Sequence, residues 1–241
     1  MKRSNIIFFF TFLVFAGILI ASISSCGKEG AASPTGLNIQ YEVLNLSPDL
    51  GAIDLYIDYR QVNGATSPYI FSINPGYFYV TSTDVPYQFR PYVPNASTGT
   101  VLFSRSDILK TGLKYSLFIS GNKSDNSLTQ TFTVDADTVP TTFGRGKIRF
   151  VNVSPTATAG LDVYANGTLA FKAVPYKYVS KYIEVPVGNY DLQINATGKT
   201  AILKELPSVT IQDGRLYTLY TYGYTNRADS AAFNAGMITN W

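Results

Sequence analysis

The chain has 241 residues, a formal net charge of +3 and no histidine. Charged residues make up 15% of it and aromatic residues 14%, with 18 tyrosines, a balance that favours twisted β-sheets over charged surface helices. The lack of histidine excludes Ser-His-Asp and Cys-His catalysis and the usual catalytic zinc sites, the low charge argues against nucleic-acid binding, and a single cysteine excludes a disulfide within the chain.

The first segment, residues 1–25, has the parts of a secretory signal peptide. A basic pair precedes an apolar run from Ile6 to Ala21, which at about 16 residues is shorter than the roughly 20 that a membrane-spanning helix needs. Two serines stand directly before Cys26, and this order resembles a bacterial lipobox, in which the cysteine is acylated and becomes the first residue after cleavage. We therefore expect a lipoprotein, bound to a membrane through lipid on Cys26.

Residues 26–36 are small, polar or proline and show no periodicity, which predicts a flexible tether. Lys28 and Glu29 follow the cysteine and resemble the signal that sends some lipoproteins of the Bacteroidetes to the cell surface, although an ordinary polar spacer is an equal alternative. The expected location is the cell envelope, as an outer membrane lipoprotein on the periplasmic side or the cell surface.

Residues 37–135 predict a first β-sandwich. From Leu37 to Leu46 the apolar residues change parity, which indicates a bulge or a strand buried on both sides. Ile53 to Asp58 alternates strictly, so that Asp54, Tyr56 and Asp58 are expected to point outward. Further strands are predicted at 69–73, 77–81, 87–93, 101–103, 114–120 and 128–134. Apart from a possible single turn near 107–110, no window has the period of an amphipathic helix.

Residues 136–145 predict a linker, and residues 146–241 a second β-sandwich. Asn166-Gly167 between apolar runs is a strong hairpin signal, because both central residues need positive φ. Strands are predicted at 147–153, 161–165, 168–174, 178–185, 189–195 and 216–224.

The two sandwiches are copies of one unit. Asn45-Leu46-Ser47-Pro48 recurs 107 positions later as Asn152-Val153-Ser154-Pro155, and Ile53-Asp54-Leu55-Tyr56 recurs 108 positions later as Leu161-Asp162-Val163-Tyr164. Near the end of each copy, the segment 112–117 corresponds to 214–219. An internal repeat of this size fixes a tandem architecture of two domains.

These motifs, together with the Asn-Gly hairpin and Glu184-Val185-Pro186-Val187-Gly188-Asn189-Tyr190, resemble the bacterial family called domain of unknown function 4397. The resemblance covers both repeats and implies immunoglobulin-like antiparallel β-sandwiches on secreted or envelope-anchored proteins, with no established catalytic residues to transfer. The first copy departs from the pattern at Asp84-Val85-Pro86-Tyr87.

The carboxylates give little sign of chemistry. Asp54 and Asp58 share a strand face but are expected about 13 Å apart, too far for a glycosidase pair, which favours solvated residues on an outer face. Asp135 and Asp137 are close enough to help hold calcium, yet they lack the ligand spacing of a known loop. We therefore expect no enzyme, no cofactor and no metal site.

The duplicated polar residues favour a structural role over ligand contact. An Asn or Asp beside a Ser-Pro turn, as at Asn45, Asn152, Asp54 and Asp162, can bond nearby backbone groups and fix the strand register.

The most suggestive candidate site is a tyrosine strip. If Tyr217 and Leu219 face the core, then Tyr220, Tyr222 and Tyr224 lie on the opposite face, where they could stack on sugar rings or pack on a protein. The alternative is that the other domain, or the chain end from 233 to 241, covers this face. The predicted function is a non-catalytic binding or adhesion module for a glycan or an envelope protein, and the alternative is a structural spacer of the envelope.

Overall fold

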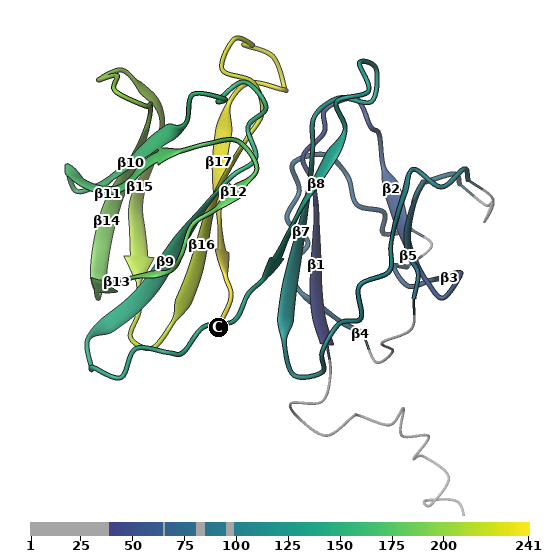
Figure 1. The fold of residues 1–241 in the computed structure, drawn as a ribbon, viewed down its shortest axis with the longest axis horizontal. Helices are drawn as coiled ribbons and strands as arrows, with labels where there is room; N and C mark the ends of the chain where they lie inside the picture. Colours follow the sequence, from purple (N-terminus) through teal and green to yellow (C-terminus); the bar gives the residue numbers. More distant parts are fainter. Residues whose placement is uncertain (1–38, 65, 81–84, 95–98) are drawn as a thin grey trace, which may run out of the picture. The chain divides into compact units, whose positions relative to one another are not determined.

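A computed structural model describes residues 39–64, 66–80, 85–94 and 99–241, so the signal peptide, Cys26 and the tether lie outside the described residues. In the described ranges all regular structure is β-strand, which confirms the all-β prediction. No helix in that part of the chain is long and apolar enough to cross a membrane. Gly36 to Trp241 belong to one compact unit, which contains two β-sandwiches (Figure 1).

The first sandwich packs two four-stranded sheets against each other. One sheet has the order β4-β1-β7-β8 and the other β3-β2-β5-β6. The strands are β1 (Ile39–Asn45), β2 (Ile53–Ile57), β3 (Arg60–Gln61), β4 (Phe78–Val80), β5 (Tyr87–Pro91), β6 (Phe103–Arg105), β7 (Lys114–Ser120) and β8 (Thr129–Val134).

The second sandwich repeats this plan. Its sheets have the orders β12-β9-β16-β17, with β13 also paired to β9, and β11-β10-β14-β15. The strands are β9 (Arg145–Asn152), β10 (Leu161–Ala165), β11 (Thr168–Val174), β12 (Tyr178–Val179), β13 (Ile183–Pro186), β14 (Gly188–Ala196), β15 (Ile202–Ile211), β16 (Leu216–Tyr222) and β17 (Asn234–Thr239).

The predicted antiparallel sandwiches are confirmed with one difference in each copy. β1 pairs with β7, and β9 with β16, in parallel, while the remaining pairs between named strands are antiparallel. The predicted strand 69–73 contributes only a bridge from Tyr69 to Ile53, and the short β3 as well as β15 and β17 were not predicted.

Each sandwich has its own apolar core, and the sheet that contains β1 is buried on its second face as well. Ile39, Tyr41 and Val43 pack in the first core, whereas Leu44 and Leu46 belong to a separate cluster that includes residues of the second repeat. The β1–β7 register has no bulge, so the change of parity marks a strand buried on both sides.

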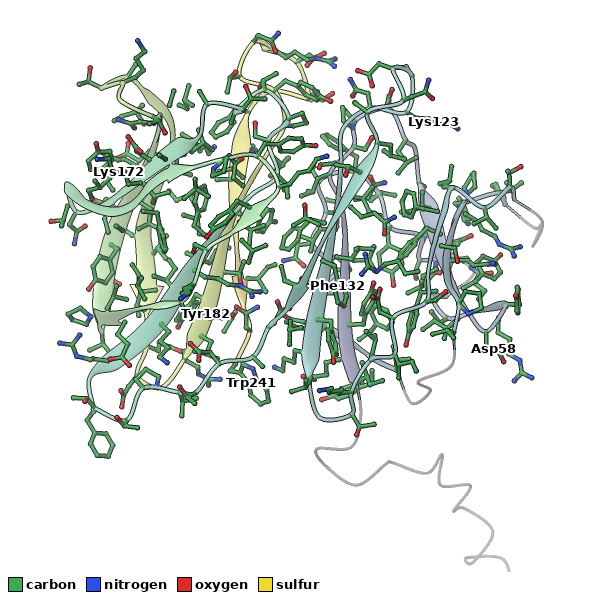
Figure 2. The ribbon with its side chains drawn as sticks, viewed as in Figure 1. Asp58, Lys123, Phe132, Lys172, Tyr182 and Trp241 are labelled. Carbon is green, nitrogen blue, oxygen red and sulfur yellow. The ribbon has the colours of Figure 1, made fainter. Side chains whose placement is uncertain are left out.

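The strand directions define two ends in this unit. We call proximal the end at which β1, β7, β9 and β16 begin; it carries the loop 106–113, the linker 136–144, the loop 212–215 and Trp241. The distal end carries the loops 46–52, 121–128, 153–160 and 223–233. The proximal parts of both repeats meet, because the Trp241 indole N–H donates to the Asp135 carbonyl (3.0 Å). Figure 2 shows Trp241 and, at the distal end, Lys123.

Candidate functional site

The predicted tyrosine strip lies between the two sandwiches. Tyr220 and Tyr222 on β16 are only 5% and 8% exposed. The Tyr220 ring packs on Phe118 of the first repeat, with centroids 5.5 Å apart, and the Tyr222 ring contacts Phe71 edge-on at 6.3 Å. These two rings are therefore packed between the repeats, and their burial does not fit the exposed ligand-contact surface expected from the sequence.

Tyr224 follows β16 at the distal end and is half-buried, unlike the other two. Burial raises the pKa of its hydroxyl to about 12, so the hydroxyl is protonated at neutral pH. The Arg227 guanidinium lies 5.8 Å from its ring centre. A strip of three outward tyrosines is therefore not formed.

The apolar part of the interface uses equivalent positions of the two copies. Leu44 and Leu46 of the first repeat correspond to Val151 and Val153 of the second, and all four lie in one buried cluster with Phe118, Tyr220, Tyr222 and Ile238. The same face of each copy thus meets its counterpart, which makes the interface close to two-fold symmetric.

On the first repeat, a cluster of buried polar side chains lies next to these apolar residues on the same face. The Ser116 hydroxyl lies 3.2 Å from the Glu42 carboxylate and 2.5 Å from the Asp135 carboxylate. The Tyr77 hydroxyl donates to Asp135 (2.6 Å). Glu42, Ser116 and Asp135 are fully buried, so every polar atom here depends on partners within the protein.

The second repeat places a chemically different group at the matching positions. Glu42 pairs with Ser116 in the β1–β7 register, and Arg149 pairs with Thr218 in the β9–β16 register. Asn240 follows β17 as Asp135 follows β8, and Tyr182 precedes β13 as Tyr77 precedes β4. The Arg149 Nε donates to the Thr218 hydroxyl (2.9 Å). The hydroxyl of Tyr182 (labelled in Figure 2) donates to the side-chain carbonyl of Asn240 (3.2 Å).

The two polar groups bond to each other across the interface. The Arg149 guanidinium forms a buried ion pair with Asp135 and also donates to the Val134 carbonyl (2.9 Å). The Asn240 amide donates to the Tyr77 hydroxyl (2.7 Å). Bidentate or multiple bonds of this kind offset the cost of burying charge, and they hold the two copies in one register.

Burial changes the protonation of this cluster. Desolvation, followed by the charge of Asp135, raises the pKa of Glu42 to about 8. Desolvation and Asp135 also raise the pKa of Tyr77 far above its ordinary value, so its hydroxyl stays a donor. At pH 7 a neutral Glu42 leaves one buried carboxylate, Asp135, facing one buried guanidinium, Arg149.

The charges make the pairing selective. Two first-repeat faces brought together would place two Asp135 carboxylates in one buried interface, and two second-repeat faces would place two Arg149 guanidiniums there. Like charges without partners in a buried interface cost several kcal/mol. Only a first face against a second face lets Asp135 meet Arg149.

The duplicated asparagines have the structural role that the sequence favours. The side-chain amide of Asn45 donates to the carbonyls of Gly51 (2.7 Å) and Tyr69 (3.2 Å), and Asn152 donates likewise to Val174 (2.9 Å). Their side-chain carbonyls accept from Ser47 N–H (3.3 Å) and Ser154 N–H (3.1 Å) respectively.

The duplicated aspartates also bond within their own repeats, Asp162 to the backbone and Asp54 to a side chain. Asp162 accepts from the N–H groups of Ala173 (2.7 Å) and Gly198 (3.0 Å). Asp54 accepts from the Asn63 amide (2.8 Å) and is 3% exposed, so the prediction of a solvated Asp54 is wrong. Tyr56 is buried too, since the Arg90 guanidinium lies 4.5 Å from its ring centre, whereas Asp58 is exposed.

The two aspartates considered for calcium are engaged with cations. Asp135 is paired with Arg149, and Asp137 lies 3.2 Å from the Lys147 ammonium. Within the described ranges no three acidic, histidine or cysteine side chains come together in a way that could hold a metal ion.

Glu42 and Arg149 were not singled out from the sequence, although a signal was available. Both interrupt strands that read as buried on two sides, and they lie 107 positions apart, the spacing of the repeat. A charge at matching buried positions of two copies, with opposite signs, indicates that the copies meet there.

The fold and interface define a class of protein with two fused β-sandwich domains. The chain matches the model of the family described as Domain of unknown function (DUF4397) over residues 40–160 and 156–239. It therefore belongs to that family. No curated protein matches it.

Proposed function

We propose that this protein is a lipid-anchored component of the bacterial envelope that acts as a non-catalytic, rigid spacer. The observation that carries the proposal is the buried interface between the repeats, where Asp135, Arg149 and the rings of Phe118 and Tyr220 tie the two sandwiches together. Two domains joined over an apolar and ion-paired face move as one body, which suits a part that holds other components at a fixed distance.

The anchor in this proposal is Cys26, the only cysteine of the chain, behind a signal-like segment. Two or three acyl chains there would bind a membrane stably without a spanning helix. Metabolic labelling with a palmitate analogue in a bacterial host tests it: wild type takes up label and Cys26→Ser does not. Equal labelling of the two would exclude the anchor.

The binding or adhesion role is the less favoured proposal, since two of the three tyrosines on which it rested are buried. A screen of residues 26–241 against envelope glycans and envelope proteins separates the two roles. The spacer predicts no ligand in this screen, together with nuclear magnetic resonance relaxation that gives both sandwiches one rotational correlation time. Binding that an exposed-surface variant abolishes at unchanged melting temperature would contradict the spacer, as would independent tumbling of the two sandwiches.

A further inference from the structure

The proximal end carries the most exposed large apolar side chains of the described residues. Phe143 in the linker is 93% exposed and Ile108 in the loop before β7 is 75% exposed. Two more large side chains at this end are exposed: Tyr59, just after β2, is 65% exposed, and Tyr79, in β4, is 66% exposed. At the distal end the largest values are 53% and 52%, for Ile73 and Tyr178.

The backbone holds Phe143 and its neighbours in place. The Gly144 and Arg145 N–H groups both donate to the Asp213 carboxylate (2.8 and 3.1 Å), which ties the linker to the loop before β16. The Val187 N–H donates to the Gly144 carbonyl (2.9 Å), and Val187 is itself 44% exposed. The apolar groups thus sit on loops that are bonded to the sheets.

Two further features of this end suit a lipid surface. Lys110 and Arg215 are exposed there and are in no ion pair with a described residue, while the nearby Asp107 and Asp137 are each paired with a cation. An apolar cavity also lies at this end of the second sandwich, lined by Ile148, Ala165, Val185, Tyr190 and Ile211 among others. Apolar side chains flanked by free cations are the pattern of proteins that lie in a membrane interface.

The direction of the chain selects the membrane as the partner. β1 begins at the proximal end at Ile39, only 13 positions after Cys26 in the sequence. Even fully extended, these residues span at most about 45 Å, so a lipid on Cys26 keeps the proximal end near the bilayer.

From these observations, and resting on the proposed anchor, we infer that the proximal end docks on the phospholipid bilayer, with Phe143 and Ile108 inserted among the headgroups and Lys110 and Arg215 facing lipid phosphates. The protein then stands on the membrane by this end and presents its distal loops outward.

The test uses the single tryptophan and the single cysteine of the chain. Residues 26–241 are coupled through Cys26 to a maleimide lipid in phosphatidylethanolamine and phosphatidylglycerol vesicles that contain brominated acyl chains. Because the coupling is chemical, the result does not depend on whether cells acylate Cys26. Quenching of Trp241 fluorescence reports how close the proximal end lies to the acyl chains.

We expect Trp241 to be quenched about twofold or more strongly than the indole of a Tyr178→Trp, Trp241→Phe variant, which reports on the distal end. The Phe143→Ser, Ile108→Ser variant should lose most of the Trp241 quenching, whereas Ile73→Ser, a matched distal change, should not. Equal quenching at the two ends, or quenching that Phe143→Ser, Ile108→Ser leaves intact, overturns the inference. If the protein docks in this vesicle assay but Cys26 takes up no palmitate analogue in cells, the lipid anchor is rejected and the docking surface is retained.

Discussion

Replacing Glu42 by glutamine should remove a pH dependence of stability that this buried carboxyl imposes. Glutamine keeps the shape of the side chain and an oxygen for the Ser116 hydroxyl, but it cannot ionise. The groups facing Glu42 are Asp135, Lys114, Ser116 and Asn74, and all of them stay in the variant.

The sign follows from a pKa that is higher in the folded chain than in the unfolded one. Folding raises the pKa of Glu42 from 4.5 to about 8. Below pH 4.5 both states hold the proton, and Glu42 imposes no penalty. As the pH rises from 4.5 to about 8, only the unfolded state gives up its proton, so the free energy of unfolding falls. At about 1.4 kcal/mol per unit of pKa, the full loss above pH 8 is about 5 kcal/mol, an upper bound because local relaxation reduces it.

The assay is urea denaturation of wild type and Glu42→Gln at pH 5, 7 and 9, followed by Trp241 fluorescence and far-ultraviolet circular dichroism. The variant should be close to wild type at pH 5 and several kcal/mol more stable at pH 9. Glu205→Gln, an exposed change of the same kind in β15, is the matched control. A difference between Glu42→Gln and wild type that is the same at all three pH values would refute the buried, uncharged state of Glu42.

Three further changes test the interface. Arg149→Met leaves Asp135 buried without its cation and should cost about 3 to 5 kcal/mol of unfolding free energy in urea titrations, while Arg227→Met, in an exposed ion pair, should have little effect on stability. Gly236→Ala places a methyl group against the Tyr220 ring and should cost about 1 to 3 kcal/mol by the same titration, so a neutral result would contradict the packing of the Tyr220 ring on Gly236 of the neighbouring strand β17. Tyr220→Ala should lower the free energy of unfolding by about 3 to 5 kcal/mol, and an unchanged melting temperature in calorimetry would contradict the burial of this ring.

Sequence patterns were sufficient where the signal is local. The strand at Ile53 to Asp58, the Asn166-Gly167 hairpin and the recurring Asn-x-Ser-Pro turn each depend on residues within one or two strands. The alternation in the first of these predicted the strand but not the burial of Asp54 and Tyr56. The parity change in β1 indicated either a bulge or a strand buried on both sides, and the unbroken β1–β7 register shows that the second alternative holds.

The missed strands have weak local patterns for physical reasons. β15 contains Pro207 and a positive φ at Ser208, and it is an edge strand, where a missing N–H costs no ladder bond. β17 contains Gly236, which sits under the Tyr220 ring. In both strands, partners elsewhere in the chain supply the stability that local propensity lacks.

The sequence did not predict the interface because its partners belong to different repeats. Asp135 lies next to a linker, where an exposed or metal-binding role is the ordinary expectation, and its cation comes from β9, on the other side of that linker. Tyr220 and Tyr222 alternate as an exposed strip would, and nothing in β16 alone distinguishes solvent from a second domain on that side.

The matched faces have a consequence for how the pair behaves on dilution. Two equal copies that meet through equivalent surfaces are the intramolecular form of a two-fold dimer. Because the linker 136–144 joins them, their effective concentration is fixed by the length of the linker, in the millimolar range for short connections, and not by the amount of protein present. The union of the two sandwiches should therefore persist at any expression level, and the opposite charges at Asp135 and Arg149 discourage either copy from pairing with the same copy of a neighbouring molecule.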